Sequence, residues 1–161
     1  MDDCRTSKSR KQQRPTYTHK NRILPIMFTE THQPRFSETD ALGHINNTVV
    51  PIWFEAARVP VFQIFIPDQD LTKWNLIIAK VEVNYLAQMG YQAPVEIRTH
   101  ISKIGNSSFN VLQEVWQNDQ RVAWGECVMV KFDYSSNRSA ALSDTEKSAL
   151  TTHFIDKAEL I

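Results

Sequence analysis

Cysteine is scarce in this chain of 161 residues, which contains only Cys4 and Cys127. Cys4 lies in a polar N-terminal stretch and Cys127 in an apolar strand pattern, so a disulfide framework is not expected. Neither cysteine has a partner at the spacing of metal ligands, and most of the histidines are scattered along the sequence. We therefore predict no metal site, no cofactor and a reducing, cytoplasmic compartment.

An excess of charge of one sign is also missing, because 18 Lys and Arg residues balance 18 Asp and Glu residues. The balance hides an uneven distribution. Residues 1–22 contain seven basic and two acidic residues, for a net charge of +5, whereas residues 23–161 carry −5. A broad face for binding nucleic acid is therefore not expected on the larger part of the chain.

The first 22 residues lack the apolar segment that a signal peptide needs. Their basic character weakly resembles an organelle transit peptide, but Asp2 and Asp3 argue against one. We predict that residues 1–22 form a basic disordered tail and that residues 23–161 form a single domain. A domain of this length can bury a core without metal or disulfide support.

The longest apolar run, residues 48–66, has four polar residues among nineteen: Thr48, Glu55, Arg58 and Gln63. Its length raises the question of a membrane span, but the two charges near its middle, together with Pro51 and Pro60, exclude one. We expect no membrane partner and, instead, a buried helix that is apolar on almost every side. Asn47 or Thr48 can cap this helix, and Pro60 should end or kink it. Glu55 and Arg58, three residues apart, could form an ion pair.

Four later stretches alternate apolar and polar residues with a period of two, which is typical of half-buried strands: residues 78–88, 95–104, 108–116 and 121–133. Another strand is predicted at residues 28–36, with Pro34 suited to an edge or a bulge. Short links with turn residues separate the four later stretches, so we expect consecutive strands to be antiparallel neighbours. Residues 143–153 predict a short C-terminal helix with a capping box of Ser143 and Glu146.

This order of elements predicts an α+β domain. A helix that is apolar on nearly every side must be wrapped by the sheet or covered by a second subunit. We therefore predict a curled antiparallel sheet wrapped around one central buried helix.

The residues just before this helix form the densest group of reactive and polar side chains in the chain: Asp40, Gly43, His44, Asn46 and Asn47. A carboxylate beside a helix N-terminus can attack a carbonyl or activate water while backbone N–H groups hold a developing oxyanion. From residue types alone, the acid and the two amides could equally be loop and capping residues.

The string Thr39-Asp40-x-x-Gly43-His44-x-Asn46-Asn47, followed by Trp53-Phe54-Glu55-x-Ala57-Arg58, resembles the hotdog-fold acyl-CoA thioesterases. Within that family it is most similar to the branch of 4-hydroxybenzoyl-CoA thioesterase, over residues 28–135. The resemblance implies a hotdog fold and hydrolysis of an acyl-CoA thioester to a free acid and CoA. It also implies a homodimer or homotetramer with active sites at the subunit interfaces.

The resemblance further implies roles for individual residues. Asp40 matches the nucleophile or general base of the family, and the backbone amide of Asn47 matches the donor that polarises the thioester carbonyl. Gly43 matches a sharp loop that brings the backbone close to the substrate. We interpret His44 as a catalytic assistant and Asn46 as a substrate contact, with purely structural loop and cap roles as the alternatives.

Other activities of the same fold remain as rivals. A hotdog module could bind acyl-CoA or an acyl carrier without turnover, although an intact Asp40 argues against this. A hydratase of this fold usually carries an Asp and a His separated by four residues, whereas three residues separate Asp40 from His44. The identity of the acyl chain, and the choice between CoA and a carrier protein, stay open at this point.

Overall fold

The computed structural model describes residues 26–160, so the predicted basic tail of residues 1–22 lies outside the described residues. Within that range the elements follow in the order β1 (Phe28–His32), the 3-10 helix η1 (Phe36–Glu38), α1 (Val49–Ala57), α2 (Val59–Phe65), η2 (Leu71–Lys73), β2 (Leu76–Tyr85), β3 (Val95–Ile104), β4 (Ser108–Gln117), β5 (Gln120–Asp133), β6 (Arg138–Ser139), α3 (Asp144–Thr151) and η3 (Lys157–Glu159).

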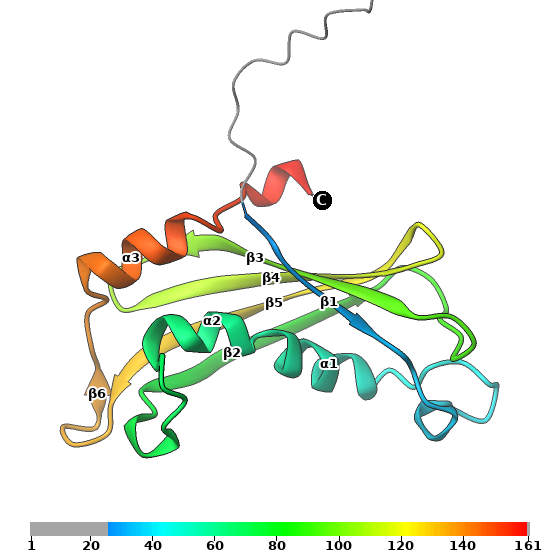
Figure 1. Cartoon of the computed structure of the whole chain (residues 1–161), viewed down its shortest axis with the longest axis horizontal. Helices are drawn as coiled ribbons and strands as arrows, with labels where there is room; N and C mark the ends of the chain where they lie inside the picture. Colours follow the sequence, from blue (N-terminus) through cyan, green and yellow to red (C-terminus); the bar gives the residue numbers. More distant parts are fainter. Residues whose placement is uncertain (1–25, 161) are drawn as a thin grey trace, which may run out of the picture.

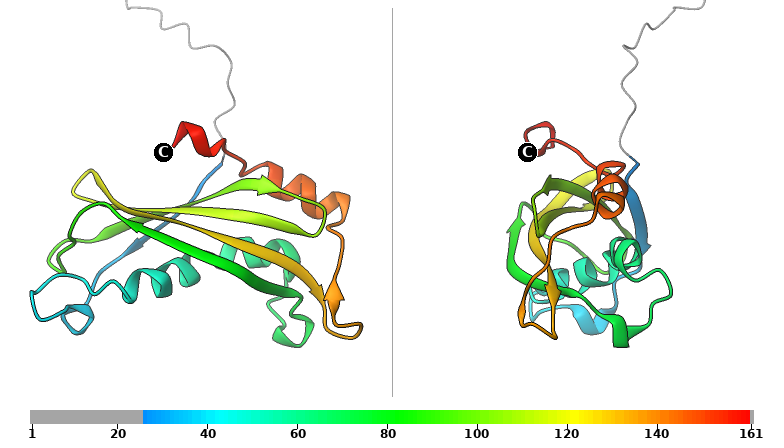
Figure 2. Two further views of the ribbon diagram at one scale, coloured as in Figure 1. Left: turned by 180° about the vertical axis from the view of Figure 1, so that it is seen from behind. Right: turned by 90° about the vertical axis from the view of Figure 1, so that its left-hand side faces the viewer.

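The described strands form one antiparallel sheet in the order β1-β3-β4-β5-β2, and the short β6 pairs with the end of β5. Helices α1 and α2 lie against one face of this sheet (Figure 1). The end-on view in Figure 2 shows the sheet curling around them. The predicted α+β fold, a curled sheet wrapped around a central helical segment, is therefore confirmed.

The expected pairing of consecutive strands holds for β3 with β4 and for β4 with β5, but it is wrong for β2 and β3. Strand β2 pairs with β5, in a register that places Val81 opposite Cys127, while β3 lies between β1 and β4. Residues 86–94 join β2 to β3. This link is longer than a tight hairpin turn and can cross to the far side of the sheet.

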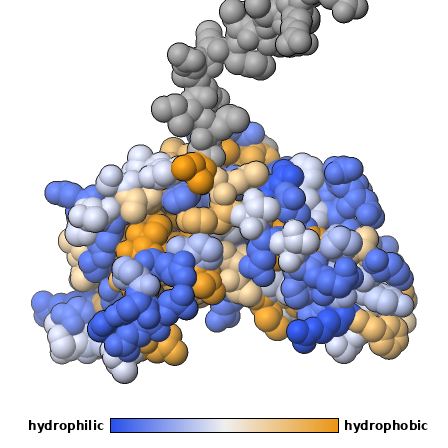
Figure 3. Space-filling model, in the orientation of Figure 1, coloured by the Kyte–Doolittle hydropathy of each residue, from blue (hydrophilic) through white to orange (hydrophobic). Residues whose placement is uncertain are grey.

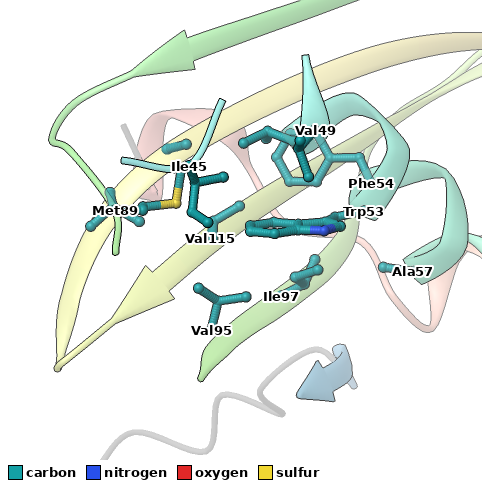
Figure 4. Packing of buried hydrophobic residues seen from close by; sticks show 12 residues of the cluster. Ile45, Val49, Trp53, Phe54, Ala57, Met89, Val95, Ile97 and Val115 are labelled. Carbon is teal, nitrogen blue, oxygen red and sulfur yellow. The ribbon is translucent and has the colours of Figure 1, made fainter. Parts of the chain in front are cut away.

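Helix α1 packs its apolar side chains onto the concave face of the sheet (Figure 4). Val50, Trp53, Phe54 and Ala57 are all nearly inaccessible to solvent. At Gly125 of β5, an added Cβ would lie 2.7 Å from the ring of Phe54, so the glycine permits the close approach of helix and strand. Trp53 is thus a core residue.

The helical segment breaks at Arg58, two residues before Pro60, which confirms the predicted effect of that proline. The predicted Glu55–Arg58 ion pair is wrong. Glu55 faces solvent, whereas Arg58 is buried and donates from Nη1 to Oε1 of Gln113 at 3.1 Å. The break turns the Arg58 side chain towards the sheet instead of along the exposed side of the helix.

The polar side chain of Gln113 joins this break to the sheet. Its Nε2 donates to the carbonyl oxygen of Phe54 at 2.9 Å and to Oγ1 of Thr99 at 3.0 Å. The Phe54 carbonyl lacks its usual helical donor because the amide of Arg58 bonds to Glu55 instead. Gln113 thus satisfies a carbonyl that the end of the helix leaves free.

The C-terminal helix α3 begins with the predicted capping box, in which Ser143 and Glu146 bond reciprocally. The segment after α3 then runs beside β3, with Ile101 bonded to both His153 and Ile155 through the backbone. The amide of Ile26 also donates to the carbonyl of Thr152. The start of the described chain and the segment after α3 therefore lie side by side at one edge of the sheet, an arrangement that the sequence did not predict.

Figure 3 shows hydrophobic surface over the region of α2. A small cavity of about 130 Å³ lies there, lined mainly by apolar side chains that include Val59, Phe62 and Trp74. None of the helices within residues 26–160 is long and apolar enough to cross a membrane.

Candidate active site

The loop between η1 and α1 is a small hairpin at one end of the sheet, drawn in cyan in Figure 1. The amide of Asp40 donates to the carbonyl of His44 at 2.7 Å, and Thr39 forms an isolated β-bridge with Ile45. The amide of Asn46 donates to the carbonyl of Glu38 at 2.8 Å. These backbone hydrogen bonds place Asp40 near the tip of the loop and lead the chain to the start of α1.

The carboxylate of Asp40 is held through one oxygen. Its Oδ1 accepts hydrogen bonds from the amides of Leu42 at 2.8 Å and His44 at 3.1 Å. Its Oδ2 accepts none from any residue between 26 and 160. Gly43 makes the turn with φ of 79°, in the left-handed region that favours glycine. The loop therefore fixes the carboxylate and leaves one oxygen free to act on another molecule.

His44 shares this turn through its backbone. Its half-buried imidazole has no hydrogen-bond partner among the residues that the structure describes. The ring is therefore free to meet a substrate, and its catalytic role stays a prediction.

Asn46 uses its side-chain oxygen to close the turn before α1, whose N-cap is Thr48, one of the two predicted candidates. Oδ1 accepts from the amide of Thr48 at 2.9 Å and from the hydroxyl of Thr48 at 2.8 Å. The carbonyl of Asn46 accepts from the amide of Val49 at 3.0 Å. The structural loop role allowed for Asn46 is thus present, and Nδ2 remains available for the predicted substrate contact.

Asn47 is exposed at the entrance to α1. Its amide, one residue before the Thr48 N-cap, donates to no described acceptor. Its carbonyl accepts from the hydroxyl of Tyr85, on β2, at 2.5 Å. No local pattern in the sequence connects Tyr85 to Asn47, which lies 38 positions earlier.

Glu38 is a second acidic residue beside the loop that the sequence did not single out. Its carboxylate accepts from the indole Nε1 of Trp53 at 3.2 Å and from the amide of Arg35 at 2.7 Å, and His32 lies 3.8 Å away. Burial acts to raise the pKa of Glu38, but these hydrogen bonds and the nearby His32 hold it below its ordinary value. Glu38 thus ties the loop to α1 as a charged group.

The hairpin register shows which of the predicted residues meet. Asp40, Gly43 and His44 share one turn, whereas Asn46 and Asn47 lie further along, where α1 begins. Across the described residues, no group of three or more His, Cys, Asp or Glu side chains could hold a metal ion. The available groups are one oriented carboxylate, one imidazole and one free backbone amide. This set suits attack on a carbonyl with stabilisation of the oxyanion.

Residues 34–150 match the thioesterase-like superfamily, and the chain belongs to that family. An uncharacterized protein of Bacillus subtilis (strain 168), YsmA, is 30% identical over 118 residues, which are 72% of this chain and 80% of that protein.

Solved structures give the same picture. A predicted thioesterase from Bacillus stearothermophilus is 40% identical, with a TM-score of 0.79 over 81% of this chain and 98% of that one. A thioesterase from Thermus thermophilus, solved with coenzyme A and Zn, is 28% identical, with a TM-score of 0.68 over 76% of this chain and 90% of that one. The 4-hydroxybenzoyl-CoA thioesterase of Pseudomonas sp. strain CBS-3 shares the fold at 16% identity, with a TM-score of 0.66 over 76% and 97% of the two chains. The hotdog fold and the resemblance to thioesterases are thereby confirmed.

Proposed function

We propose that this protein is an acyl-CoA thioesterase that hydrolyses a thioester to a free acid and CoA. Asp40 is the base or nucleophile, and the amide of Asn47 holds the carbonyl oxygen. The observation that carries the proposal is the state of Asp40, whose Oδ1 is fixed by two backbone amides while Oδ2 is left free. The unpaired Oδ2 is available to take a proton from water or to attack a carbonyl carbon.

The chemistry follows from these two groups. As a base, Oδ2 of Asp40 takes a proton from water while the water oxygen bonds to the carbonyl carbon, and the Asn47 amide stabilises the negative oxygen. The C–S bond then breaks, and the CoA sulfur leaves and takes up a proton. As a nucleophile, Asp40 bonds to the carbonyl carbon directly, and the C–S bond breaks as the CoA thiolate leaves and takes up a proton. Water then hydrolyses the resulting anhydride to the free acid and regenerates the Asp40 carboxylate. His44 orients Asp40 or the substrate, while Gly43 and Asn46 contact the substrate.

CoA as the thiol is supported by the Thermus thermophilus thioesterase, which was solved with coenzyme A. We also propose a cytoplasmic homodimer or homotetramer. Strand β2 forms an edge of the sheet, and its Ile78 and Val81 are 46% and 49% exposed. Exposed apolar residues on an edge strand are a favourable surface for a second subunit.

Thiol release from short, long and aromatic acyl-CoAs tests the proposal, with Asp40→Asn as the decisive variant. We expect a loss of roughly 10²–10⁴-fold in kcat on the best substrate, the usual contribution of a positioned acid or base. Light scattering on the same samples should give an oligomeric mass for both proteins, because the asparagine side chain can still accept both loop hydrogen bonds through one oxygen.

Asp144→Asn is the matched control, since this exposed residue begins α3 at the opposite end of the sheet (Figure 1). It should retain full turnover. Unchanged kcat in Asp40→Asn would contradict the assigned role. Saturable acyl-CoA binding without thiol release in the unmodified protein would instead favour the non-catalytic binding module, and a monomeric mass would contradict the proposed assembly.

A further inference from the structure

The carbonyl of Asn47 lies one residue before Thr48, the N-cap of α1, and the helix cannot extend its hydrogen bonds back to this carbonyl. In an α-helix the carbonyl of residue i accepts from the amide of residue i+4. For Asn47 that residue is Pro51, which has no N–H group. The proline ring also crowds the carbonyl four residues before it. The Asn47 carbonyl therefore needs a donor from outside the helix.

Tyr85 supplies this donor from β2. Its hydroxyl lies 2.5 Å from the Asn47 carbonyl oxygen, and no other described residue donates to that oxygen. Burial raises the pKa of Tyr85, so the phenol keeps the proton that it donates. The contact links the central helix to the edge strand at the point where the loop of Asp40 ends.

The peptide group between Asn47 and Thr48 is also held through its N–H. The N–H of the Asn47–Thr48 peptide belongs to Thr48 and donates to Oδ1 of Asn46. With both its oxygen and its N–H engaged, this peptide plane has little freedom to rotate. The preceding peptide carries the free N–H of Asn47, and its direction depends on the peptide that follows.

We propose that Tyr85 is a positioning residue of the active site, which aims the Asn47 amide at the oxyanion by holding the carbonyl that Pro51 leaves without a partner. This inference rests on the proposed thioesterase function. Tyr85 acts through the backbone of Asn47 and takes no part in bond making. Its phenol replaces the helical hydrogen bond and keeps the peptide tilted towards β2.

The test compares Tyr85→Phe with Tyr134→Phe, a control at an exposed tyrosine that packs on Phe132. Direct removal of an oxyanion donor costs about 10²–10³-fold in kcat, so loss of a group that only aims the donor should cost less, about tenfold. We expect KM to change by less than about twofold, because the aim of an oxyanion donor matters chiefly in the transition state. An unchanged kcat in Tyr85→Phe would overturn the proposal.

Pro51→Ala separates positioning from other roles of the phenol. Alanine restores an N–H at residue 51 that can donate to the Asn47 carbonyl. In the Pro51→Ala background the Asn47 carbonyl keeps a donor when the phenol is lost. Tyr85→Phe should therefore reduce kcat by less than about threefold there, compared with about tenfold in the unmodified protein. An equal loss in both backgrounds would show that Tyr85 does not act through this carbonyl.

Amide hydrogen exchange provides a readout without substrate. In Tyr85→Phe the Thr48 amide should exchange faster than in the unmodified protein, and Tyr134→Phe should leave it unchanged. If the unmodified protein released no thiol from any acyl-CoA, the proposed function would fail and the catalytic part of this inference with it. The exchange rates would then decide separately whether Tyr85 holds the peptide, and an unchanged Thr48 rate would contradict that.

Discussion

The two ends of helix α1 differ in what they leave exposed, although a side chain from the sheet meets a backbone carbonyl at both. At each end a carbonyl lacks a helical donor, and a side chain from the sheet donates to it instead. Tyr85 of β2 donates to the Asn47 carbonyl at the start, and Gln113 of β4 donates to the Phe54 carbonyl near the end. One contact lies at the exposed entrance to the helix and the other in the core.

The difference lies in what each arrangement leaves free. Gln113 bonds to Phe54, Thr99 and Arg58 together, so nearly all of its hydrogen-bonding capacity is used within the interior. At the other end the Asn47 amide keeps no described partner, although its neighbouring peptide is held on both sides. A satisfied polar cluster in the core stabilises the fold, whereas a fixed but unsatisfied amide at the surface is available to a ligand.

The largest effect should come from the buried end. Gln113→Leu keeps a similar volume but leaves the Arg58 guanidinium and the Phe54 carbonyl without their partner. Leaving a buried hydrogen-bonding group without its partner costs about 1–3 kcal/mol, and more when the group is charged. We expect the free energy of unfolding, measured in urea, to fall by about 3 kcal/mol.

A double-mutant cycle with Arg58→Met tests this reason. If the cost comes from stranding the charge, the pair Gln113→Leu and Arg58→Met should lose less stability than Gln113→Leu alone, since two apolar residues leave no buried charge. Additive losses would show that the two side chains are independent.

A smaller effect is expected where Asn46 closes the turn before the open end. Asn46→Ala frees the Thr48 amide and should lower the free energy of unfolding by about 1 kcal/mol, the usual cost of losing one hydrogen bond. Asn46→Asp, which retains the accepting oxygen, should restore it. Turnover by the aspartate variant separates the two roles of this residue. A raised KM with normal stability would support the substrate contact through Nδ2, and an unchanged KM would leave only the turn.

The smallest effect should be a change in the pH dependence of stability near the open end. The pKa of Glu38 is lower in the folded protein than its ordinary value of 4.5. Its ionised form therefore contributes stability that is complete above about pH 4.5 and is lost as the pH falls through the folded value. Glu38→Gln should flatten the decline of the unfolding midpoint in acid. Glu30→Gln, at an exposed site on β1, is the control, and equal acid profiles for Glu38→Gln and the unmodified protein would contradict the assignment.

Local patterns in the sequence predicted much of this architecture. The alternation over residues 95–104 matches the bounds of β3, and Ser143 with Glu146 marks the start of α3. The break near Pro60 also followed from one residue type. These features depend on neighbours in the chain, so the sequence contains their cause directly.

Contacts between distant segments could not be predicted in this way. The ion pair expected between Glu55 and Arg58 gave way to Gln113, which is 55 residues from Arg58 in the chain. Tyr85 meets Asn47 only because β2 forms the edge of the sheet beside the start of α1. Asp40 was recognisable through its string of neighbours, but the two amides that fix its Oδ1 depend on how the loop closes. The roles proposed for Asp40, His44, Asn46 and Asn47 remain predictions.

The meeting of Ile26 with Thr152 and His153 has a practical consequence for handling this protein. The start of β1 and the segment after α3 meet at one edge of the sheet, while the loop of Asp40 lies at a distant corner (Figure 1). A bead or a sensor chip attached through the exposed Thr152, beside this junction, would therefore lie far from that loop. Tethering at this position should leave the loop open to solution, so immobilised protein can serve for the binding and turnover experiments described above.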